Sequence, residues 1–237
     1  CGKTTLMRMV NAMVTPTSGR VFVRDQDVAG EDPVRLRRSI GYVLQEGGLF
    51  PHRSIADNIA TVPRLEGATK QASRERALEL LELVGLDREM ADRYPAQLSG
   101  GQRQRVGVAR ALANRADILL MDEPFGALDP IVRTELQCEL KEIQRALGTT
   151  ILFVTHDVDE AFTLGDQVAV LSTGGHIEQV GTPTELLSSP ASPFVAEFVG
   201  ASRAARPVRV AGPGGLVVDD AGTPVGTLTT DEAGERP

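Results

Sequence analysis

The sequence predicts an α/β fold with a mostly parallel core sheet and an inserted all-helical subdomain. Apolar runs at residues 40–44, 118–121 and 151–154 have the length of strands and lack polar alternation, which is typical of strands covered on both faces. Helical patterns separate these runs, as expected for parallel strands joined by crossover helices. From about residue 69 to residue 115 the pattern is helical throughout, which indicates a helical insertion.

Local patterns predict the individual elements. A helix-like run begins after Thr5, and residues 21–23 form a short strand. Apolar residues at helical spacing predict a helix that Gly85 stops, and Pro130 begins a long amphipathic helix that runs toward Leu147. These elements complete an alternation of strands and helices around the inserted helical stretch.

The last third of the chain has a different character. Two apolar runs that flank Gly174-Gly175 form a hairpin signal. After Gly200 the composition shifts to Ala, Arg, Gly and Pro, so residues 201–215 are predicted to be a linker, and residues 216–228 a second hairpin-like piece. We therefore predict a main domain over residues 1–200 and a tail over residues 201–237.

Composition limits the function. The chain has 237 residues with 41% hydrophobic side chains, enough for a sizeable core, and a formal net charge of -7, which argues against a nucleic-acid partner. Cys1 and Cys138 suggest no disulfide framework, which fits a reducing compartment. No apolar run approaches the ~20 residues of a membrane-spanning helix. Any membrane association is therefore expected to come through a partner.

Two short motifs carry phosphate chemistry. Gly2-Lys3-Thr4 matches the end of a phosphate-binding loop, in which the lysine contacts phosphate oxygens and the hydroxyl contacts Mg²⁺. Asp122 and Glu123 end an apolar strand, where the first carboxylate can hold Mg²⁺ and the second can take a proton from water. Each motif alone is weak or moderate evidence, because a Gly-Lys-Thr tripeptide and a pair of exposed acids both occur by chance.

The string Leu98-Ser99-Gly100-Gly101-Gln102 is more specific. Ser99 is well placed to cap the following helix, and the two glycines allow a phosphate to approach that helix's backbone. Ser-Gly-Gly can be an ordinary loop, but the five-residue string some 20 residues before the Asp122-Glu123 strand end is hard to obtain by accident.

With these motifs in view, residues 1–200 resemble the ATP-binding subunits of ABC transporters, which have a P-loop NTPase fold. The resemblance covers all the family's motifs in the family's order. They are a partial Walker A at Gly2-Lys3-Thr4-Thr5, a Q-loop glutamine at Gln45, the signature at residues 98–102, Walker B with its glutamate at Asp122-Glu123, a D-loop at Ala127-Leu128-Asp129 and a switch histidine at His156.

The resemblance implies a set of roles and partners. Two copies of the chain pair head to tail, and each ATP is held by the phosphate loop of one copy and the signature of the other. ATP and Mg²⁺ are the expected ligands. The implied catalytic residues are Glu123, His156 and Gln45; the implied ATP-binding residues are Gly2, Lys3, Thr4, Thr5, Ser99, Gly100, Gly101, Gln102 and Asp129; the implied metal-binding residues are Thr4, Gln45 and Asp122.

The stretch after Gln45 resembles importers of glycine betaine, choline and related osmoprotectants, as does Val62-Pro63. The resemblance implies an integral membrane permease that docks here, with Leu49 and Phe50 either exposed to it or packed into their own domain. A substrate-binding protein acts indirectly, and the chain is expected at the cytoplasmic face of the cell membrane as a peripheral subunit. Importers of methionine or polyamines and non-transport ABC ATPases are the alternatives.

The ends of the chain depart from the family's pattern. The family's two opening strands and its first phosphate-loop glycines have no counterpart, so we expect the chain to be a piece of a longer protein and residues 1–237 alone to bind ATP·Mg poorly. Residues 216–229 resemble part of a CBS domain, a module that serves some osmoprotectant cassettes as a sensor. So short a piece is expected to be a remnant without sensing function.

Overall fold

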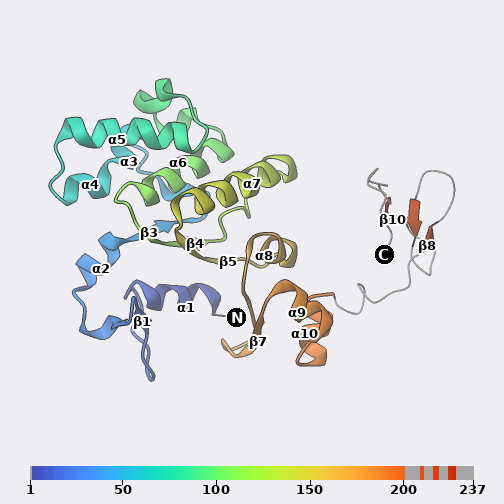
Figure 1. The fold of residues 1–237 in the computed structure, drawn as a ribbon. Helices are drawn as coiled ribbons and strands as arrows, with labels where there is room; N and C mark the ends of the chain where they lie inside the picture. Colours follow the sequence, from blue (N-terminus) through green and yellow to red (C-terminus); the bar gives the residue numbers. More distant parts are fainter. Residues whose placement is uncertain (1, 201–208, 211–215, 219–223, 228–237) are drawn as a thin grey trace. The chain divides into compact units, whose positions relative to one another are not determined.

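The computed structural model describes residues 2–200, 209–210, 216–218 and 224–227 (Figure 1). Within these ranges, two compact units can be distinguished. The first contains residues 2–164 and 172–176, and the second contains residues 165–171 and the described residues from 177 onward. These units do not follow the predicted division at residue 200, which stays a prediction.

The core of the first unit is a three-stranded parallel sheet. Its strands are β3 (Ile40–Val43), β4 (Ile118–Asp122) and β5 (Thr150–Val154), in that order, with Ile118 aligned to both Ile40 and Thr150. The predicted parallel sheet is therefore confirmed. Its three strands match the three apolar runs, to within a residue at their ends.

Central strand β4 shows why those runs lack polar alternation. Leu119, Leu120 and Met121 are all fully buried, although neighbouring side chains of a strand point to opposite faces. Leu119 and Met121 lie in one apolar cluster with the helical part of the chain, and Leu120 lies in a second cluster with Met7 and Leu36. The strand is thus covered on both faces.

The helical insertion begins earlier than predicted. Two short helices, α3 (Ile55–Ile59) and α4 (Thr61–Leu65), precede α5 (Lys70–Leu83), so helix starts well before residue 69. Pro63 did not end the run because it stands in the first turn of α4, where a missing N–H costs little. The 3₁₀ turns η3 (Arg88–Asp92) and η4 (Pro95–Gln97) lead into α6 (Gly100–Leu112).

Helix α7 (Pro130–Leu147) has the bounds that the sequence predicts. Asp129 caps its first turn and Pro130 occupies the first helical position, while Gly148 ends it with a φ of +63°. Its buried face carries Leu136, Leu140 and Ile143, which recur at helical spacing. Strong signals at both ends explain the agreement.

The remaining elements of the first unit are short. Helix α1 (Lys3–Val10) is followed by the antiparallel pair β1 (Phe22–Val23) and β2 (Gln26–Asp27), the 3₁₀ turn η1 (Val28–Gly30) and helix α2 (Pro33–Ser39). The 3₁₀ turn η2 (Gln45–Gly48) follows β3, and α8 (Val158–Leu164) follows β5. Figure 1 shows α1 below the sheet and α6 above it, in agreement with the two apolar clusters.

The second unit contains the predicted hairpin, β6 (Val168–Leu171) paired antiparallel with β7 (Ile177–Gly181), and helices α9 (Pro183–Ser188) and α10 (Pro193–Phe198). In the tail, β9 (Leu216–Val218) pairs with β10 (Pro224–Thr227), as the hairpin signal predicts. The predicted linker is wrong at residues 209–210, which form strand β8 beside β9. Val210 favours a strand, but the Ala, Arg, Gly and Pro residues around it are typical of a linker, so the sequence did not predict β8.

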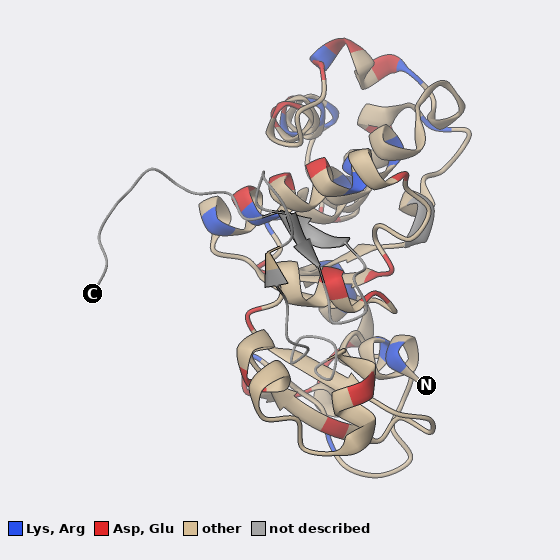
Figure 2. Cartoon of the chain, turned by 90° about the vertical axis from the view of Figure 1, so that its right-hand side faces the viewer, with Lys and Arg blue, Asp and Glu red and all other residues tan. Residues whose placement is uncertain are grey.

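Charged residues are interspersed along the described helices (Figure 2). Many pair across neighbouring elements, for example Arg38 with Glu66 and Arg74 with Asp92. The bidentate contact of Arg74 lowers the pKa of the Asp92 carboxyl. No helix within the described residues combines the length and apolar character needed to cross a bilayer.

Helix α6 is hydrogen-bonded to the segment that follows β3, at Gly47 and Gly48. Both side-chain amino groups of Arg110 donate to that segment, one to Gly48 O and one to Gly47 O, each at 2.8 Å. Burial lowers the pKa of the Arg110 guanidinium. A Cβ on Gly47 would lie 2.7 Å from the carbonyl oxygen of Arg103, and one on Gly107 would lie 3.1 Å from Gly47 Cα. Glycines at 47 and 107 therefore permit a backbone contact that larger residues would prevent.

Gly47→Ala is expected to destabilise the protein far more than Gly67→Ala. Both glycines have a left-handed φ, +76° and +89°, but only Gly47 faces a neighbouring backbone. Gly67→Ala should cost about 1 kcal/mol from backbone strain alone, and Gly47→Ala about 2–4 kcal/mol because a collision is added. Urea denaturation of both variants measures the difference. Equal midpoints for the two would show that the segment moves away from α6 without cost.

Candidate functional site

Helix α1 presents the phosphate-loop residues. Gly2 precedes it with a φ of +97°, a conformation that favours glycine, and Lys3, Thr4 and Thr5 form its first turn. The N–H groups of a first turn lack partners within the helix and carry the positive end of its dipole. Met7, which is 1% exposed, anchors α1 on the sheet. The turn can therefore bind an anion.

Thr4 and Asp122 meet although 118 positions separate them. The Thr4 hydroxyl donates to Asp122 Oδ1 at 2.9 Å, and the Asp122 side chain is 14% exposed. Asp122 is the last residue of β4, so the strand delivers the carboxylate to the start of α1. Arg8 Nη2 lies 4.0 Å from Asp122 Oδ2, a neighbour that the sequence motifs did not indicate.

These donors fit Mg²⁺ bound with a nucleotide. Among the described residues, no group of three or more His, Cys, Asp or Glu side chains could hold a metal unaided. Mg²⁺ typically takes one or two protein oxygens and completes its shell with water and phosphate oxygens. The hydroxyl of Thr4 and the carboxylate of Asp122 supply hard oxygen ligands of that kind.

Glu123 has a strained backbone. Its φ of +45° is left-handed, which costs energy for a residue with a side chain. Two backbone hydrogen bonds hold it: its N–H donates to Val154 O at 3.0 Å, and its carbonyl accepts from Gly126 N at 3.3 Å. Non-glycine residues in this conformation are concentrated at functional sites. The strained turn makes Glu123 a candidate functional residue, and its role as a base stays a prediction.

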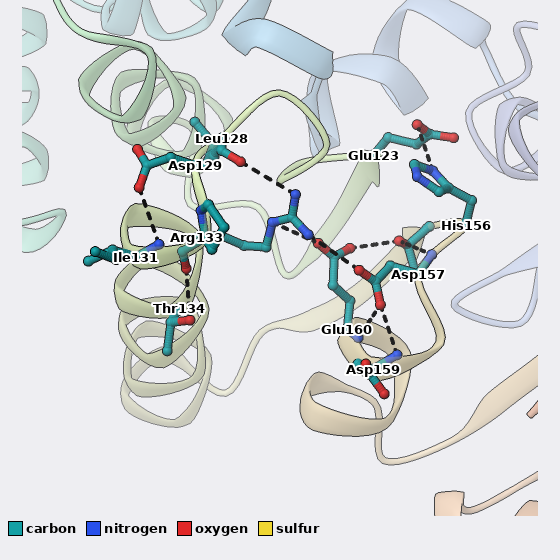
Figure 3. Close-up of polar contacts among 12 residues, drawn as sticks. Glu123, Leu128, Asp129, Ile131, Arg133, Thr134, His156, Asp157, Asp159 and Glu160 are labelled. Atoms are coloured by element: carbon teal, nitrogen blue, oxygen red, sulfur yellow. Dashed lines mark hydrogen bonds and ion pairs between the residues drawn. The ribbon is translucent and has the colours of Figure 1, made fainter. Parts of the chain in front are cut away.

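His156 lies beside Glu123. Its Nδ1 is 3.2 Å from Glu123 Oε2, and the side chains of the two residues are 68% and 32% exposed (Figure 3). The pair comes from the carboxyl ends of neighbouring parallel strands, β4 and β5. Ligands of open α/β sheets bind at this edge. A carboxylate and an imidazole that remain open to solvent here can move a proton.

The Ser99 segment forms a capping box at the start of α6. Ser99 Oγ accepts from Gln102 N at 3.2 Å, and Gln102 Oε1 accepts from Ser99 N at 3.0 Å. Gly100 is exposed, whereas a Cβ on Gly101 would lie 2.7 Å from the Val132 side chain. The predicted cap is therefore confirmed, on the face of the sheet opposite α1.

Asp129 and Gln45 complete the predicted residues. The Asp129 carboxylate accepts from the N–H groups of Ile131 and Val132, which accounts for it as a helix cap. Gln45 begins η2, two residues after the last residue of β3, and its side chain lies outside the described part of the chain. Their proposed contacts with nucleotide and metal stay predictions.

Sequence reasoning missed a group of charged residues next to the site. Arg133 contacts Asp157 and approaches Glu160, and these acids lie one and four residues after His156 (Figure 3). The sequence indicated only that Arg133 lies one helical turn after Asp129, and therefore close to the D-loop. The partners of Arg133 lie 24 and 27 residues away along the chain, so only the folded structure reveals these contacts.

The fold and these motifs define an ATP-binding cassette of the P-loop NTPase class. The sequence profile of the ABC transporter family matches residues 1–126, and the chain belongs to this family. A dimeric structure of the ATP-binding cassette MJ0796 in a post-hydrolysis state, bound to ADP and Pi, superposes with a TM-score of 0.67. Its sequence is 33% identical to this chain, and the match covers 76% of this chain and 80% of the MJ0796 chain.

Particular relatives are importer subunits. The chain is 55% identical over 203 residues to the glycine betaine/carnitine/choline transport ATP-binding protein OpuCA of Bacillus subtilis, covering 86% of this chain and 53% of OpuCA. It is 48% identical over 204 residues to the osmoprotectant import ATP-binding protein OsmV of Salmonella typhimurium, covering 86% and 53%. The chain thus spans about half the length of these relatives. The predicted family and subfamily resemblance is confirmed.

Thr4→Val is expected to weaken Mg²⁺-dependent ATP binding about tenfold, the scale of one lost ligand or charge-assisted hydrogen bond. The substitution keeps the shape of the side chain but removes the hydroxyl that reaches Asp122. Thr4→Ser should restore binding, and Thr17→Val, in an exposed turn, should leave it unchanged. Calorimetry of the full-length protein with and without Mg²⁺ is the measurement. If Thr4→Val binds ATP as tightly as the wild type in the presence of Mg²⁺, the Thr4 hydroxyl does not contribute to binding.

Proposed function

We propose that this chain forms part of an ATP-hydrolysing subunit that powers import of a quaternary ammonium osmoprotectant, such as glycine betaine or choline. The observation that carries the ATPase part is the meeting of Thr4, Asp122, Glu123 and His156 at one edge of the core sheet. The identity to OpuCA and OsmV supports the cargo.

The phosphate end of the nucleotide binds at the start of α1. Lys3 neutralises phosphate charge, and the N–H groups around Gly2, Thr4 and Thr5 hold phosphate oxygens. Thr4 and Asp122 would hold Mg²⁺, and Gln45 is a further proposed metal-binding residue. When bound, Mg²⁺ neutralises charge that builds up on the phosphate oxygens.

Glu123 takes the proton of the attacking water. Its strained turn aims a half-exposed carboxylate past the end of β4, and His156 keeps that carboxylate in place at 3.2 Å. His156 also contacts the transferred phosphoryl group from the end of β5. Positioning and charge neutralisation of this kind supply most of the rate in phosphoryl transfer.

A second copy of the chain completes the site. The signature begins helix α6, on the face of the sheet opposite α1; its residues are Ser99, Gly100, Gly101 and Gln102. Within one copy, the start of α6 and the start of α1 therefore do not contact the same phosphate. A head-to-tail pair places the signature of one copy, with Asp129 nearby, against the phosphate loop of the other. The dimeric state of the related cassette MJ0796 supports the pairing of two copies.

A membrane permease docks on the segment after η2. Phe50 is 40% exposed and Leu65 59% exposed, and both line a surface groove with Arg53, Asp57, Thr61 and Arg64. Leu49 instead packs against the chain's own core. The groove has an apolar patch with charged walls, which suits an amphipathic helix.

Buried Asn58 holds this groove in shape. It exchanges hydrogen bonds with the N–H and carbonyl of Phe50, at 2.7 and 3.1 Å, and donates to the carbonyls of Arg53 and Ser54. These bonds hold the backbone of residues 50–54, which forms one side of the groove. Docking here places the subunit at the cytoplasmic face of the cell membrane, where a substrate-binding protein acts on it only through the permease.

Glu123→Gln is expected to lower ATP turnover by at least 100-fold while ATP stays bound, because an amide keeps the shape but takes no proton. The full-length protein, assayed for phosphate release and nucleotide affinity, tests this. The variant should also trap a nucleotide-bound dimer, visible by light scattering. Turnover near wild type would assign the base to another residue.

Ser99→Arg provides the complementary test in the Glu123→Gln background. A bulky cation at the proposed interface should prevent the trapped dimer, while ATP still binds to the phosphate loop of each copy. A dimer that persists would move the interface away from the start of α6.

Uptake measurements test the cargo. Cells with and without the gene receive labelled glycine betaine or choline at high osmolarity, and loss of uptake is expected in the deletion. Labelled spermidine and sulfate are the controls, because the chain is 46% identical to a spermidine/putrescine import ATP-binding protein of Frankia alni and 51% identical to a sulfate/thiosulfate import ATP-binding protein of Brucella melitensis. Loss of a control solute alone would assign another cargo.

A further inference from the structure

Arg133 connects two loops that the proposed site needs. It stands in the first turns of α7, and its guanidinium reaches both the Leu128-Asp129 turn and the segment after β5 that carries His156 (Figure 3). We propose that Arg133 is a positioning residue that links the dimer-facing D-loop to His156 and, through it, to Glu123. The inference rests on the proposed ATPase function, for which it names a residue outside the family motifs found in the sequence.

On one side, Arg133 contacts the D-loop turn with an ordinary helical backbone bond and with one hydrogen bond from its side chain. Its backbone N–H donates to Asp129 O at 2.9 Å, and its Nη2 donates to Leu128 O at 3.4 Å. Asp129 in turn caps α7 through the N–H groups of Ile131 and Val132. A displacement of this turn by a second copy therefore displaces the Arg133 side chain.

On the other side, Arg133 holds the residues around His156. Its Nη1 donates to Asp157 Oδ2 at 3.3 Å, and its Nε lies 3.7 Å from Glu160 Oε1. Asp157 directly follows His156, and its other oxygen caps α8 by accepting from the N–H groups of Asp159 and Glu160. One guanidinium thus faces two carboxylates from the beginning of α8.

Glu160 extends the connection to the residue before His156. Its side chain is 5% exposed, and its Oε2 accepts from the Thr155 hydroxyl at 2.6 Å. That hydroxyl also accepts from Asp157 N at 3.0 Å. Both neighbours of His156 in the chain are therefore held by the cluster that Arg133 neutralises.

The position of His156 depends on this cluster because its own ring is largely free. The imidazole is 68% exposed, and its Nδ1 lies 3.2 Å from Glu123 Oε2. The ring is located by its backbone, and the backbone is held by Thr155, Asp157 and Glu160. A shift of the Leu128-Asp129 turn can reach His156 through Arg133 without any contact between the two loops.

Charge makes the contact sensitive to the nature of residue 133. A buried carboxylate needs a cation or hydrogen-bond donors nearby, and Arg133 is the cation that faces both Asp157 and Glu160 in the part of the chain that the structure describes. Arginine can also serve a carbonyl and two carboxylates at once, because its planar guanidinium carries five donors. A lysine keeps the charge but is a single point donor.

The test uses the full-length protein assembled with its partner subunits, in three variants. Arg133→Met removes the charge, Arg133→Lys keeps the charge but not the fork, and Arg145→Met changes an exposed arginine in the last turn of the same helix. Measurements are kcat, KM for ATP, the Hill coefficient for ATP and the melting temperature.

Arg133→Lys should lower kcat about tenfold with KM within about twofold and the melting temperature within about 2 °C of wild type. Arg133→Met should lower kcat further. Both variants should reduce any cooperativity in ATP toward a Hill coefficient of 1, because displacement of the D-loop no longer changes the position of His156. Arg145→Met should match wild type.

A kcat for Arg133→Lys equal to that of Arg145→Met would overturn the proposal. A loss of activity in Arg133→Met that follows only its melting temperature, with Arg133→Lys fully active, would also overturn it, since the role would then be structural. Absence of ATP hydrolysis in the wild-type assembly would instead refute the proposed function.

Discussion

Two-sided burial of β4 is the constraint that organises this cassette. Leu119 and Met121 pack into one apolar cluster and Leu120 into the other, so helices from both sides are held against one strand. Fully burying side chains of this size contributes about 1.5–3 kcal/mol each, relative to exposing them. The strand then has no freedom to slip, since a shift of one residue would exchange its two faces. The acids at its end are therefore delivered to one place.

The polar residues at the edge of the sheet depend on that rigidity. Thr4 reaches Asp122 only because α1 packs on the face that holds Leu120, and Glu123 keeps a left-handed φ only because Val154 O and Gly126 N hold it. Strain of this kind persists where the surroundings over-determine the backbone. The side chain of Arg133 likewise connects the segment after β5 to the D-loop turn, through Asp157 and Leu128 O.

Helix α6 couples the helical insertion to the sheet edge. Its first turn is the Ser99 capping box, and near its other end Arg110 holds the carbonyls of Gly47 and Gly48. The exposed Phe50 follows shortly after in the chain. The proposed interface with a second copy and the proposed permease groove are thus attached to one helix.

Sequence patterns alone determined the parallel sheet and the bounds of α7. Apolar runs without alternation require cover on both faces, and the Asp129-Pro130 start and the Gly148 end leave a helix little choice. Family motifs also named the candidate residues, whose roles stay predictions. Where local signals were weak, the sequence was less informative: the helices at residues 55–65 and the strand at residues 209–210 were missed.

Tertiary structure alone decided which of these residues meet. The contact of Thr4 with Asp122 spans 118 positions, and that of Arg133 with Asp157 spans 24. The left-handed φ of Glu123 likewise has no signal in its own residue type, which normally avoids that conformation. Such features arise because packing brings distant backbones together and repays local strain with hydrogen bonds and burial elsewhere, and a linear pattern records only the preferences of neighbouring residues.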